Sequence, residues 1–185
     1  MATRKRLGRT DWTDAALEAL AEGGLAAIAV EPIAARLNTT KGSFYWHFAN
    51  RDALVAATLE RWVDVHTEAV IREVGKAPPA DRLDRLFATV FSHALENRVD
   101  LALLADADDP MVAPVLALVT ERRVAFITEC LLELGFTKQQ ARHRAVLAYT
   151  AYIGLVHAQR ASGGKLLPVA ARAGYLDFLK QALTP

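Results

Sequence analysis

The stretch "VEPIAARLNTTKGSFYWHF", residues 30–48, decides the expected fold. The apolar residues of its first half recur at the i, i+3, i+4, i+7 spacing of one helix face, from Val30 to Leu37. Asn38 then tolerates the left-handed conformation that often ends a helix, and Thr40 can cap a second helix that begins at the next residue. The three residues from Asn38 to Thr40 are a connection of the size found in a helix-turn-helix. The sequence therefore predicts two short helices joined by a tight turn.

The second of these helices, expected over residues 41–48, has two chemically different faces. At 100° per residue, Phe44 and Phe48 fall on one face, and we expect them in the core beneath the helix. The rest of the helix would point away from that core. The expected outward residues are Lys41, Gly42, Tyr45 and Trp46.

The outward face has the chemistry of a nucleic-acid contact. A helix N-terminus attracts phosphate, and Lys41 adds a full positive charge there. Gly42 has no side chain and would let the helix approach a base edge closely. Tyr45 and Trp46 offer polar tips for phosphate oxygens and apolar bodies for thymine methyl groups. The residues suited to backbone phosphates where the chain leaves the groove are His47 and Arg51.

Packing is the alternative role for Tyr45 and Trp46, either against the next helix or against a neighbouring subunit. Aromatic residues at helical spacing usually belong to a core, and matches to short motifs often mislead. Taken alone, these residues favour neither role over the other.

Composition limits the class of protein without naming a partner. The chain has 185 residues, 52% of them hydrophobic and 23% charged, and its formal net charge is +1. These values are typical of a globular protein that buries a core. Four positive residues precede the first acid, Asp11, and they are Arg4, Lys5, Arg6 and Arg9. A basic arm is usually a solvated tail unless a segment that binds nucleic acid follows it.

Cysteine content and hydropathy favour a soluble, cytoplasmic protein. Cys130 is the single cysteine, which excludes an intrachain disulfide and a thiolate metal cluster. The N-terminus lacks the apolar run of a signal peptide, and no stretch approaches the ~18 apolar residues of a membrane helix. His66, His93 and His157 do not have a metal-ligand spacing. We expect no metal and no cofactor.

The rest of the chain predicts helices almost throughout, because alanine and leucine dominate and alternating β-branched runs are missing. A first helix would be capped by Thr10 or Asp11 and would end at Gly23-Gly24. The later expected helices cover about 52–74, 81–95, from a break at 106–110 to Leu134, 138–162 after a Thr137 cap, and 168–183. The expected fold class is all-α with about nine helices.

The segment "VEPIAARLNTTKGSFYWHFANRDAL", residues 30–54, resembles the DNA-binding signature of the tetracycline-repressor (TetR) family of bacterial transcription regulators. "WTDAALEALAEGGL", residues 12–25, resembles the first helix of that family. The shared elements are Ile33-Ala34, Lys41-Gly42, Phe44-Tyr45, His47-Phe48, a basic residue at Arg51, and Leu54. The resemblance covers about the first third of the chain. It implies a three-helix helix-turn-helix DNA-binding domain over residues 1–51, with the start of a fourth helix to about residue 66. A C-terminal regulatory and dimerisation domain would cover residues 52–185.

The resemblance favours DNA binding as the role of the outward face. The family usually has lysine at the position of Arg51 and glycine at that of Asn38. Arginine keeps the cation, and asparagine can still enter the left-handed region. Ile28-Ala29 stands where the family often has threonine or serine, which removes a hydroxyl cap. The predicted DNA-binding residues are Arg4, Lys5, Arg6, Thr39, Thr40, Lys41, Gly42, Tyr45, Trp46, His47 and Arg51.

The family binds DNA with two DNA-binding domains, one from each subunit. The resemblance therefore also implies a homodimer on a near-palindromic operator, with recognition helices about 34–36 Å apart. In this family the last two long helices of each subunit form the dimer as a four-helix bundle. The alternative for these helices is that their apolar stripes face the core of their own subunit. The predicted interface residues are Ala148, Tyr152, Leu155, Leu176, Leu179 and Leu183.

Family members typically bind a small molecule in the C-terminal domain, and this shifts the spacing of the two DNA-binding domains. The implied function is a repressor that a ligand releases from its operator. Few candidate pocket residues are polar, so a small apolar or aromatic ligand is expected rather than a sugar or nucleotide. The candidate ligand-binding residues are Trp62, His66, Phe87, Phe91, Phe126, Cys130, Tyr149, Tyr152 and His157.

Two other classes of protein compete with this interpretation. An all-α carboxylate metalloenzyme would need Glu-x-x-His pairs, and the sequence has none. It also lacks G-x-S-x-G, a phosphate-binding loop and H-E-x-x-H, so we expect no enzyme activity. The remaining alternative is a helical protein that binds small molecules or other proteins without binding DNA.

Overall fold

The computed structural model describes residues 7–94 and 98–184. Within these ranges the regular elements are all helices, and no β-strand occurs. By compactness the described chain divides into two units. The N-terminal unit contains residues 7–65 and 98–116, and the C-terminal unit contains residues 66–94 and 117–184. The prediction of an all-α fold is confirmed.

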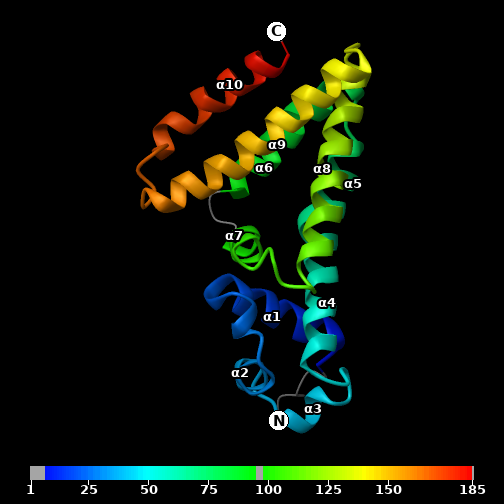
Figure 1. The fold of residues 1–185 in the computed structure, drawn as a ribbon, viewed down its shortest axis with the longest axis vertical. Helices are drawn as coiled ribbons and strands as arrows, with labels where there is room; N and C mark the ends of the chain where they lie inside the picture. The colour runs from blue at the N-terminus through cyan, green and yellow to red at the C-terminus, as the bar shows by residue number, and fades with distance from the viewer. Residues whose placement is uncertain (1–6, 95–97, 185) are drawn as a thin grey trace, which may run out of the picture. The chain divides into compact units, whose positions relative to one another are not determined.

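The N-terminal unit is built around α1, and Figure 1 shows its elements in blue, cyan and green. Its elements are α1 (Arg9–Gly23), a 3-10 turn (Leu25–Ala27), α2 (Val30–Arg36), α3 (Lys41–Phe44), α4 (Arg51–Val63), α7 (Arg98–Ala105) and the first residues of α8 (Ala113–Glu133). Its largest fully buried side chains come from these helices and, in the case of Ile28, from the loop before α2. They are Trp12, Leu20, Ile28, Ile33, Phe44, Leu54, Val55, Trp62 and Leu103. Burial of these apolar side chains supplies the main stabilisation of the unit.

The ends of α1 only partly follow the prediction. The helix begins at Arg9 with Gly8 as N-cap residue, so neither Thr10 nor Asp11 is itself the N-cap, but the Asp11 side chain does cap the start of the helix. Asp11 lies one turn further in, and its Oδ2 accepts a hydrogen bond of 2.7 Å from the Gly8 N–H. At the other end, Gly24 has φ 71°, a left-handed conformation that glycine adopts without steric cost.

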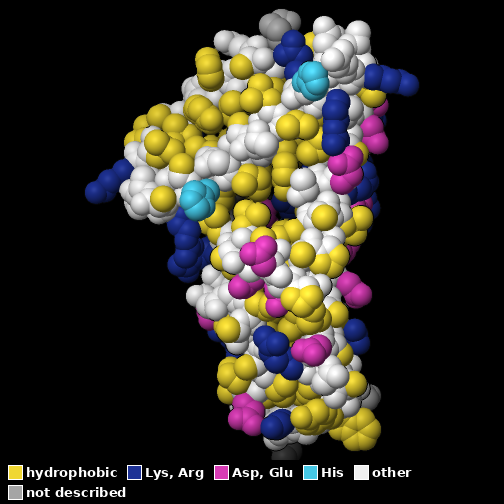
Figure 2. Space-filling view, viewed as in Figure 1, with side chains coloured by type: hydrophobic (Ala, Val, Ile, Leu, Met, Phe, Trp, Pro, Cys, Tyr) yellow, Lys and Arg dark blue, Asp and Glu magenta, His cyan; other side chains and the backbone are white. Residues whose placement is uncertain are grey.

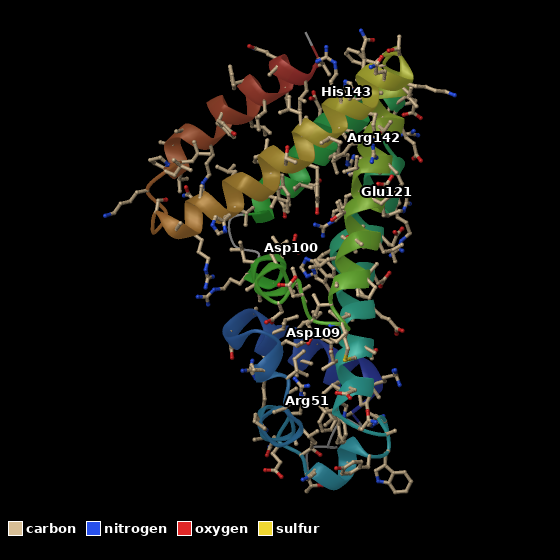
Figure 3. The ribbon with its side chains drawn as sticks, in the orientation of Figure 1. Arg51, Asp100, Asp109, Glu121, Arg142 and His143 are labelled. Carbon is tan, nitrogen blue, oxygen red and sulfur yellow. The ribbon has the colours of Figure 1, made fainter. Side chains whose placement is uncertain are left out.

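Helix α7 was given no range in the sequence analysis, and it packs against α1 in the N-terminal unit. The Trp62 indole Nε1 donates a 2.8 Å hydrogen bond to Oδ1 of the buried Asp100, which Figure 3 labels on α7. Just after the helix, Asp106 Oδ2 accepts a 3.0 Å hydrogen bond from the Leu25 N–H. A segment from the middle of the sequence is therefore part of the same unit as the helix-turn-helix.

The C-terminal unit contains α5 (Ala69–Gly75), α6 (Pro79–Ala94), most of α8, α9 (Lys138–Ala161), a 3-10 turn (Val169–Ala171) and α10 (Arg172–Leu183). Thr137 caps α9 as predicted, since its side chain accepts from the Gln140 N–H. The expected single helix over 52–74 is α4 followed by a π turn (Asp64–Glu68) and α5. The described residues contain ten labelled α-helices. If α4 and α5 are counted as one helix, the number is nine, which agrees with the prediction.

One buried cluster holds the C-terminal unit together. It consists of Val74, Leu83, Leu86, Phe87, Val124, Phe126, Ile127, Cys130, Leu131, Ala141, Ala145, Ala148 and Leu183. On the surface, Arg142 of α9 points toward Glu121 of α8, as Figure 3 shows, and Arg142 NH2 lies 3.0 Å from Glu121 Oε2. In the described residues, no helix combines the length and apolar character needed to cross a membrane.

Candidate nucleic-acid interface

The turn between α2 and α3 has the conformation that its sequence predicts. Asn38 has φ 51° and is the only described non-glycine residue with a positive φ. Its N–H donates to the Ala35 carbonyl at 3.0 Å, and the Thr39 N–H donates to the Ala34 carbonyl at 2.9 Å. These bonds satisfy carbonyls at the end of α2 that have no partner within the helix. The turn therefore fixes the direction in which α3 begins.

Helix α3 is shorter than predicted. It ends at Phe44 rather than Phe48, and the N–H groups of His47 and Phe48 both donate to the Phe44 carbonyl, at 2.9 and 3.0 Å. Thr40 is the N-cap residue, but its hydroxyl makes no capping hydrogen bond, so that part of the prediction is wrong. Because α3 has only four residues, the attraction of its helix dipole for phosphate is weaker than that of the predicted eight-residue helix.

The inward aromatic residues pack as predicted despite the early end of α3. Phe44 is fully buried and Phe48 is 3% exposed. The Phe44 ring meets Trp12 edge to face at 5.5 Å and stacks on Phe48 at 5.5 Å between centroids. The turn after Phe44 keeps roughly the rotation of a helix. Phe48, four residues after Phe44, therefore still lies on the same side as Phe44.

The outward aromatic residues are open to solvent in this chain. Tyr45 is 57% exposed and Trp46 is 88% exposed. Packing of Trp46 against α4, one of the two alternatives left open by the sequence, is therefore not what the structure shows. Two large aromatic side chains are thus held outward by a turn that is anchored on its other side.

Gly42 lies beside them with space for a larger residue. A Cβ placed on Gly42 would have Thr40 Oγ1 as its nearest neighbour at 3.6 Å, an ordinary van der Waals contact. Gly42 also has no positive φ. Neither the backbone conformation nor the packing within the chain requires glycine at this position.

The two cations predicted to contact phosphate have partners within the chain. Lys41 Nζ lies 2.9 Å from Glu31 Oε1, and this hydrogen bond raises the pKa of Lys41 and lowers the pKa of Glu31. Arg51 donates from Nε to the Ile28 carbonyl at 2.7 Å and from NH2 to the Leu25 carbonyl at 2.8 Å. Figure 3 labels Arg51 beside these elements. Arg51 therefore anchors the loop before α2, a contact across 23 to 26 residues of sequence.

Arg9 is a further cation at this candidate interface. From the sequence it was expected only as part of the basic N-terminal arm. Its guanidinium lies over the Phe48 ring, 4.6 Å from the centroid, and its NH1 donates to the His47 carbonyl at 3.3 Å. A cation over an aromatic face is attracted by the ring quadrupole. Arg9 thus holds a positive charge at the turn that follows α3.

The other predicted DNA-binding residues lie around this face or beyond the described chain. Thr40 is exposed, whereas Thr39 and His47 are half-buried. The predicted contacts of Arg4, Lys5 and Arg6 lie outside the described residues. For every one of these positions, contact with DNA stays a prediction.

Some of the predicted ligand-binding residues come together in the C-terminal unit. Phe91 lies 6.3 Å from Phe87, 6.3 Å from Tyr152 and 6.5 Å from Tyr175, between ring centroids. Tyr175 was not predicted, because it is on α10 and its approach to α6 and α9 cannot be read from sequence spacing. We refer to these four residues as the aromatic cluster.

The remaining ligand candidates are scattered. Trp62 belongs to the N-terminal unit with its indole N–H bound to Asp100, and His157 is exposed. Cys130 is 1% exposed, and burial raises the pKa of its thiol to about 11, so it is protonated and unreactive at neutral pH. The other candidates are half-buried or buried in the C-terminal unit, and they are His66, Phe126 and Tyr149.

Most of the predicted dimer-interface residues face the core of their own subunit. Ala148, Tyr152, Leu155 and Leu183 are buried, and Leu176 and Leu179 are half-buried. Other apolar residues of the same two helices are exposed instead. They include Leu147 at 55% and Phe178 at 63%. Figure 2 shows hydrophobic side chains gathered on the surface over α9 and α10.

Among the described residues no group of three His, Cys, Asp or Glu side chains is arranged to hold a metal ion.

The comparison with protein families gives one match. The model described as "Bacterial regulatory proteins, tetR family" matches residues 13–58, which contain most of α1 and all of α2 and α3. A comparison with curated proteins finds no match.

Solved structures share the fold over nearly the whole chain. A transcriptional regulator from Rhodococcus sp. Rha1 has a TM-score of 0.77 at 22% identity, with 96% of each chain covered. SmeT, the repressor of the Stenotrophomonas maltophilia multidrug efflux pump SmeDEF, has 0.71 at 19% identity, covering 97% of this chain and 92% of that one. The fatty acid degradation regulator FadR from Bacillus halodurans has 0.67 at 17%, covering 95% and 93%.

At these identities the solved structures establish the fold, and the family match establishes the type of N-terminal domain. Residues 13–58 therefore match the tetR family of bacterial regulatory proteins, and the whole chain has the fold of the solved transcriptional regulators.

Proposed function

We propose that this protein is a sequence-specific repressor that binds operator DNA through the outward face of α3 and the turn that follows it. The observation that carries the proposal is the pair of exposed rings, Tyr45 at 57% and Trp46 at 88%, above the buried Phe44 and Phe48. Large apolar side chains gathered at one exposed site are typical of a surface that binds a partner. A groove of DNA covers them while their polar tips reach phosphate oxygens.

Gly42 supports the same partner. Because the chain itself leaves room for a side chain at this position, a glycine here is explained by the close approach of a molecule from outside. A helix that enters the major groove brings its first residues against base edges. Lys41 and Thr40, next to Gly42, supply a cation and a hydroxyl for the adjoining phosphates.

A homodimer supplies the second DNA-binding domain. Exposed apolar and small residues on α9 and α10 recur at helical spacing, and they include Leu147, Gly154, Gly174 and Phe178. Two such helices from each of two subunits form a four-helix bundle with small residues at the close crossings. We propose this exposed face as the dimer interface, in place of the buried stripe that the sequence had indicated.

A small apolar or aromatic effector is the proposed signal. The aromatic cluster (Phe87, Phe91, Tyr152 and Tyr175) comes from α6, α9 and α10 and provides ring faces and edges for such a ligand. The similar proteins SmeT and FadR are described as the repressor of a multidrug efflux pump and a fatty acid degradation regulator. Repression relieved by an effector, in the cytoplasm and without any catalytic step, is the mode we propose for this chain.

The proposal is tested with a fluorescent DNA fragment taken from the promoter region next to the protein's own gene. Anisotropy is measured as the protein is titrated, first at about 50 mM salt and then at rising concentrations. We expect saturable binding that weakens steeply with salt, because cations that contact phosphates release counterions. Competitor DNA of unrelated sequence should displace the labelled fragment only at about 10³-fold or greater excess.

The competing function is a helical protein that binds small molecules or proteins without binding DNA. It predicts no anisotropy change at any salt concentration, with the protein still folded by circular dichroism. Binding that does not distinguish the promoter fragment from unrelated DNA would contradict the sequence-specific part of the proposal.

A further inference from the structure

Lys41 does not lie free on the proposed DNA-binding face. Its ammonium group is 2.9 Å from the carboxylate of Glu31, in the first turn of α2. The two residues are ten apart in sequence, and the left-handed turn at Asn38 brings them together. Both side chains are open to solvent, Lys41 at 53% and Glu31 at 73%.

Glu31 has no need to be near Lys41 for the fold to form. An ion pair between two solvent-exposed side chains contributes little to folding stability. Elsewhere in the same unit, Arg36 of α2 has two carboxylate partners on α1, Glu18 and Glu22, and that group ties two helices together. The Lys41–Glu31 pair instead spans two elements already joined by a short turn.

Charge makes this pair important for DNA. Lys41 is protonated and Glu31 is ionised at neutral pH, and their hydrogen bond raises the pKa of Lys41 and lowers that of Glu31. A phosphate that approaches Lys41 must therefore compete with the Glu31 carboxylate, which is already paired with the Lys41 ammonium group.

We propose that Glu31 limits the affinity of this protein for DNA by competing with phosphate for Lys41. The inference rests on the proposed function and adds a residue that sets the strength of binding. A moderate affinity suits a repressor that must leave its operator when an effector binds, because a smaller free-energy change is then enough to release it.

Ion release gives the proposal a quantitative signature. A free lysine that binds a DNA phosphate releases about 0.9 of a condensed cation. Rising salt also weakens the Lys41–Glu31 pair, and this partly offsets the loss of phosphate contact in the wild type. Removal of the Glu31 charge removes that offset.

The experiment compares four proteins on the same promoter fragment: the wild type, Glu31→Gln, Lys41→Met and the double variant. Dissociation constants are measured by anisotropy at several salt concentrations. Glu18→Gln is the matched control, because it removes one negative charge from the same unit and leaves Arg36 paired with Glu22. Thermal melting of each variant checks that the fold is retained.

We expect Glu31→Gln to bind DNA about two- to fivefold more tightly than Glu18→Gln at low salt. Its plot of log affinity against log salt should also be steeper than that of the wild type, because salt no longer weakens a competing ion pair. Both effects should disappear when Lys41→Met is present. Equal affinities for Glu31→Gln and Glu18→Gln, or a gain that persists without Lys41, would overturn the proposal. A wild-type protein that binds no DNA at low salt would instead overturn the proposed function, and this inference with it.

Discussion

At the scale of single residues, the phase of the helix assigns different roles to adjacent aromatic side chains. Phe44→Ala removes a fully buried ring that contacts Trp12 and Phe48, and should lower the free energy of unfolding by about 3–5 kcal/mol. Tyr45→Ala removes an exposed ring and should leave stability nearly unchanged, while weakening DNA binding by about 1–3 kcal/mol. Urea denaturation and DNA titration of both variants measure the two effects. Equal destabilisation by the two substitutions would show that Tyr45 is also part of the core.

Gly42→Ala separates stability from binding at the neighbouring position. A Cβ fits here within the chain, and alanine is favoured over glycine in a helix, so stability should stay constant or rise by up to about 1 kcal/mol. The same methyl group would stand between the helix and the DNA, and affinity for the promoter fragment should fall about tenfold or more. Thermal melting and anisotropy on one preparation provide both readings. A variant that binds DNA as tightly as the wild type would remove Gly42 from the interface.

Helical periodicity predicted which of these side chains face inward. It did not predict that the two cations, Lys41 and Arg51, have partners within the chain. Phe44 and Phe48 could be assigned inward because residues four apart share a side, whatever happens at the end of the helix. Lys41 and Arg51 looked free because their partners, Glu31 and the carbonyls of Leu25 and Ile28, are 10 to 26 residues away. Contacts of that kind depend on the fold, and a helical wheel does not contain them.

At the scale of elements, α7 was the helix that sequence reasoning did not assign. It has eight residues, and it packs against α1, which is far away in the chain. Short segments carry a weak periodic signal, and their structure is decided by tertiary packing. The π turn between α4 and α5 was missed for a related reason, since one irregular turn leaves the apolar pattern nearly unchanged.

The attachment of α7 can be tested through Trp62. Trp62→Phe keeps most of the buried ring but removes the indole N–H that donates to the buried Asp100 carboxylate. We expect the free energy of unfolding to fall by about 1–3 kcal/mol, because a hydrogen bond to a buried charged group is lost. Trp46→Phe is the matched control, being the same substitution at an exposed position, and should leave stability unchanged. If both variants unfold at the wild-type urea concentration, the Trp62–Asp100 bond does not hold α7 in place.

At the scale of the whole molecule, the sequence indicated the two helices that we propose for dimerisation. However, most of the residues it predicted for the interface lie on the buried side of these helices. Alanine and leucine stripes on α9 mark an apolar side, and periodicity cannot tell a side that faces the subunit from one that faces a partner. Burial of Ala148, Tyr152 and Leu155 places that stripe inside the C-terminal unit. The exposed Leu147 and Phe178 are the residues that we propose for the dimer interface.

Phe178→Glu tests that interface. A charge at a position that is 63% exposed in the single chain costs little in the monomer, whereas it is unfavourable within a packed interface. We expect the wild type to have twice the 20.2 kDa chain mass by light scattering, and the variant to become monomeric and to lose most of its affinity for the promoter fragment. Phe178→Leu should remain dimeric. A dimeric Phe178→Glu would place the interface elsewhere.

The central claim, that the outward aromatic face meets DNA, can be measured with the protein's own tryptophans. Trp12 is fully buried and Trp62 is 1% exposed, whereas Trp46 is 88% exposed. Acrylamide, a neutral quencher, should therefore quench mainly Trp46 in the free protein, and Trp46→Phe should remove that component. At a saturating concentration of the promoter fragment, we predict that quenching of the wild type falls to nearly the level of Trp46→Phe. Unchanged quenching of Trp46, while anisotropy shows that the same DNA is bound, would contradict the account.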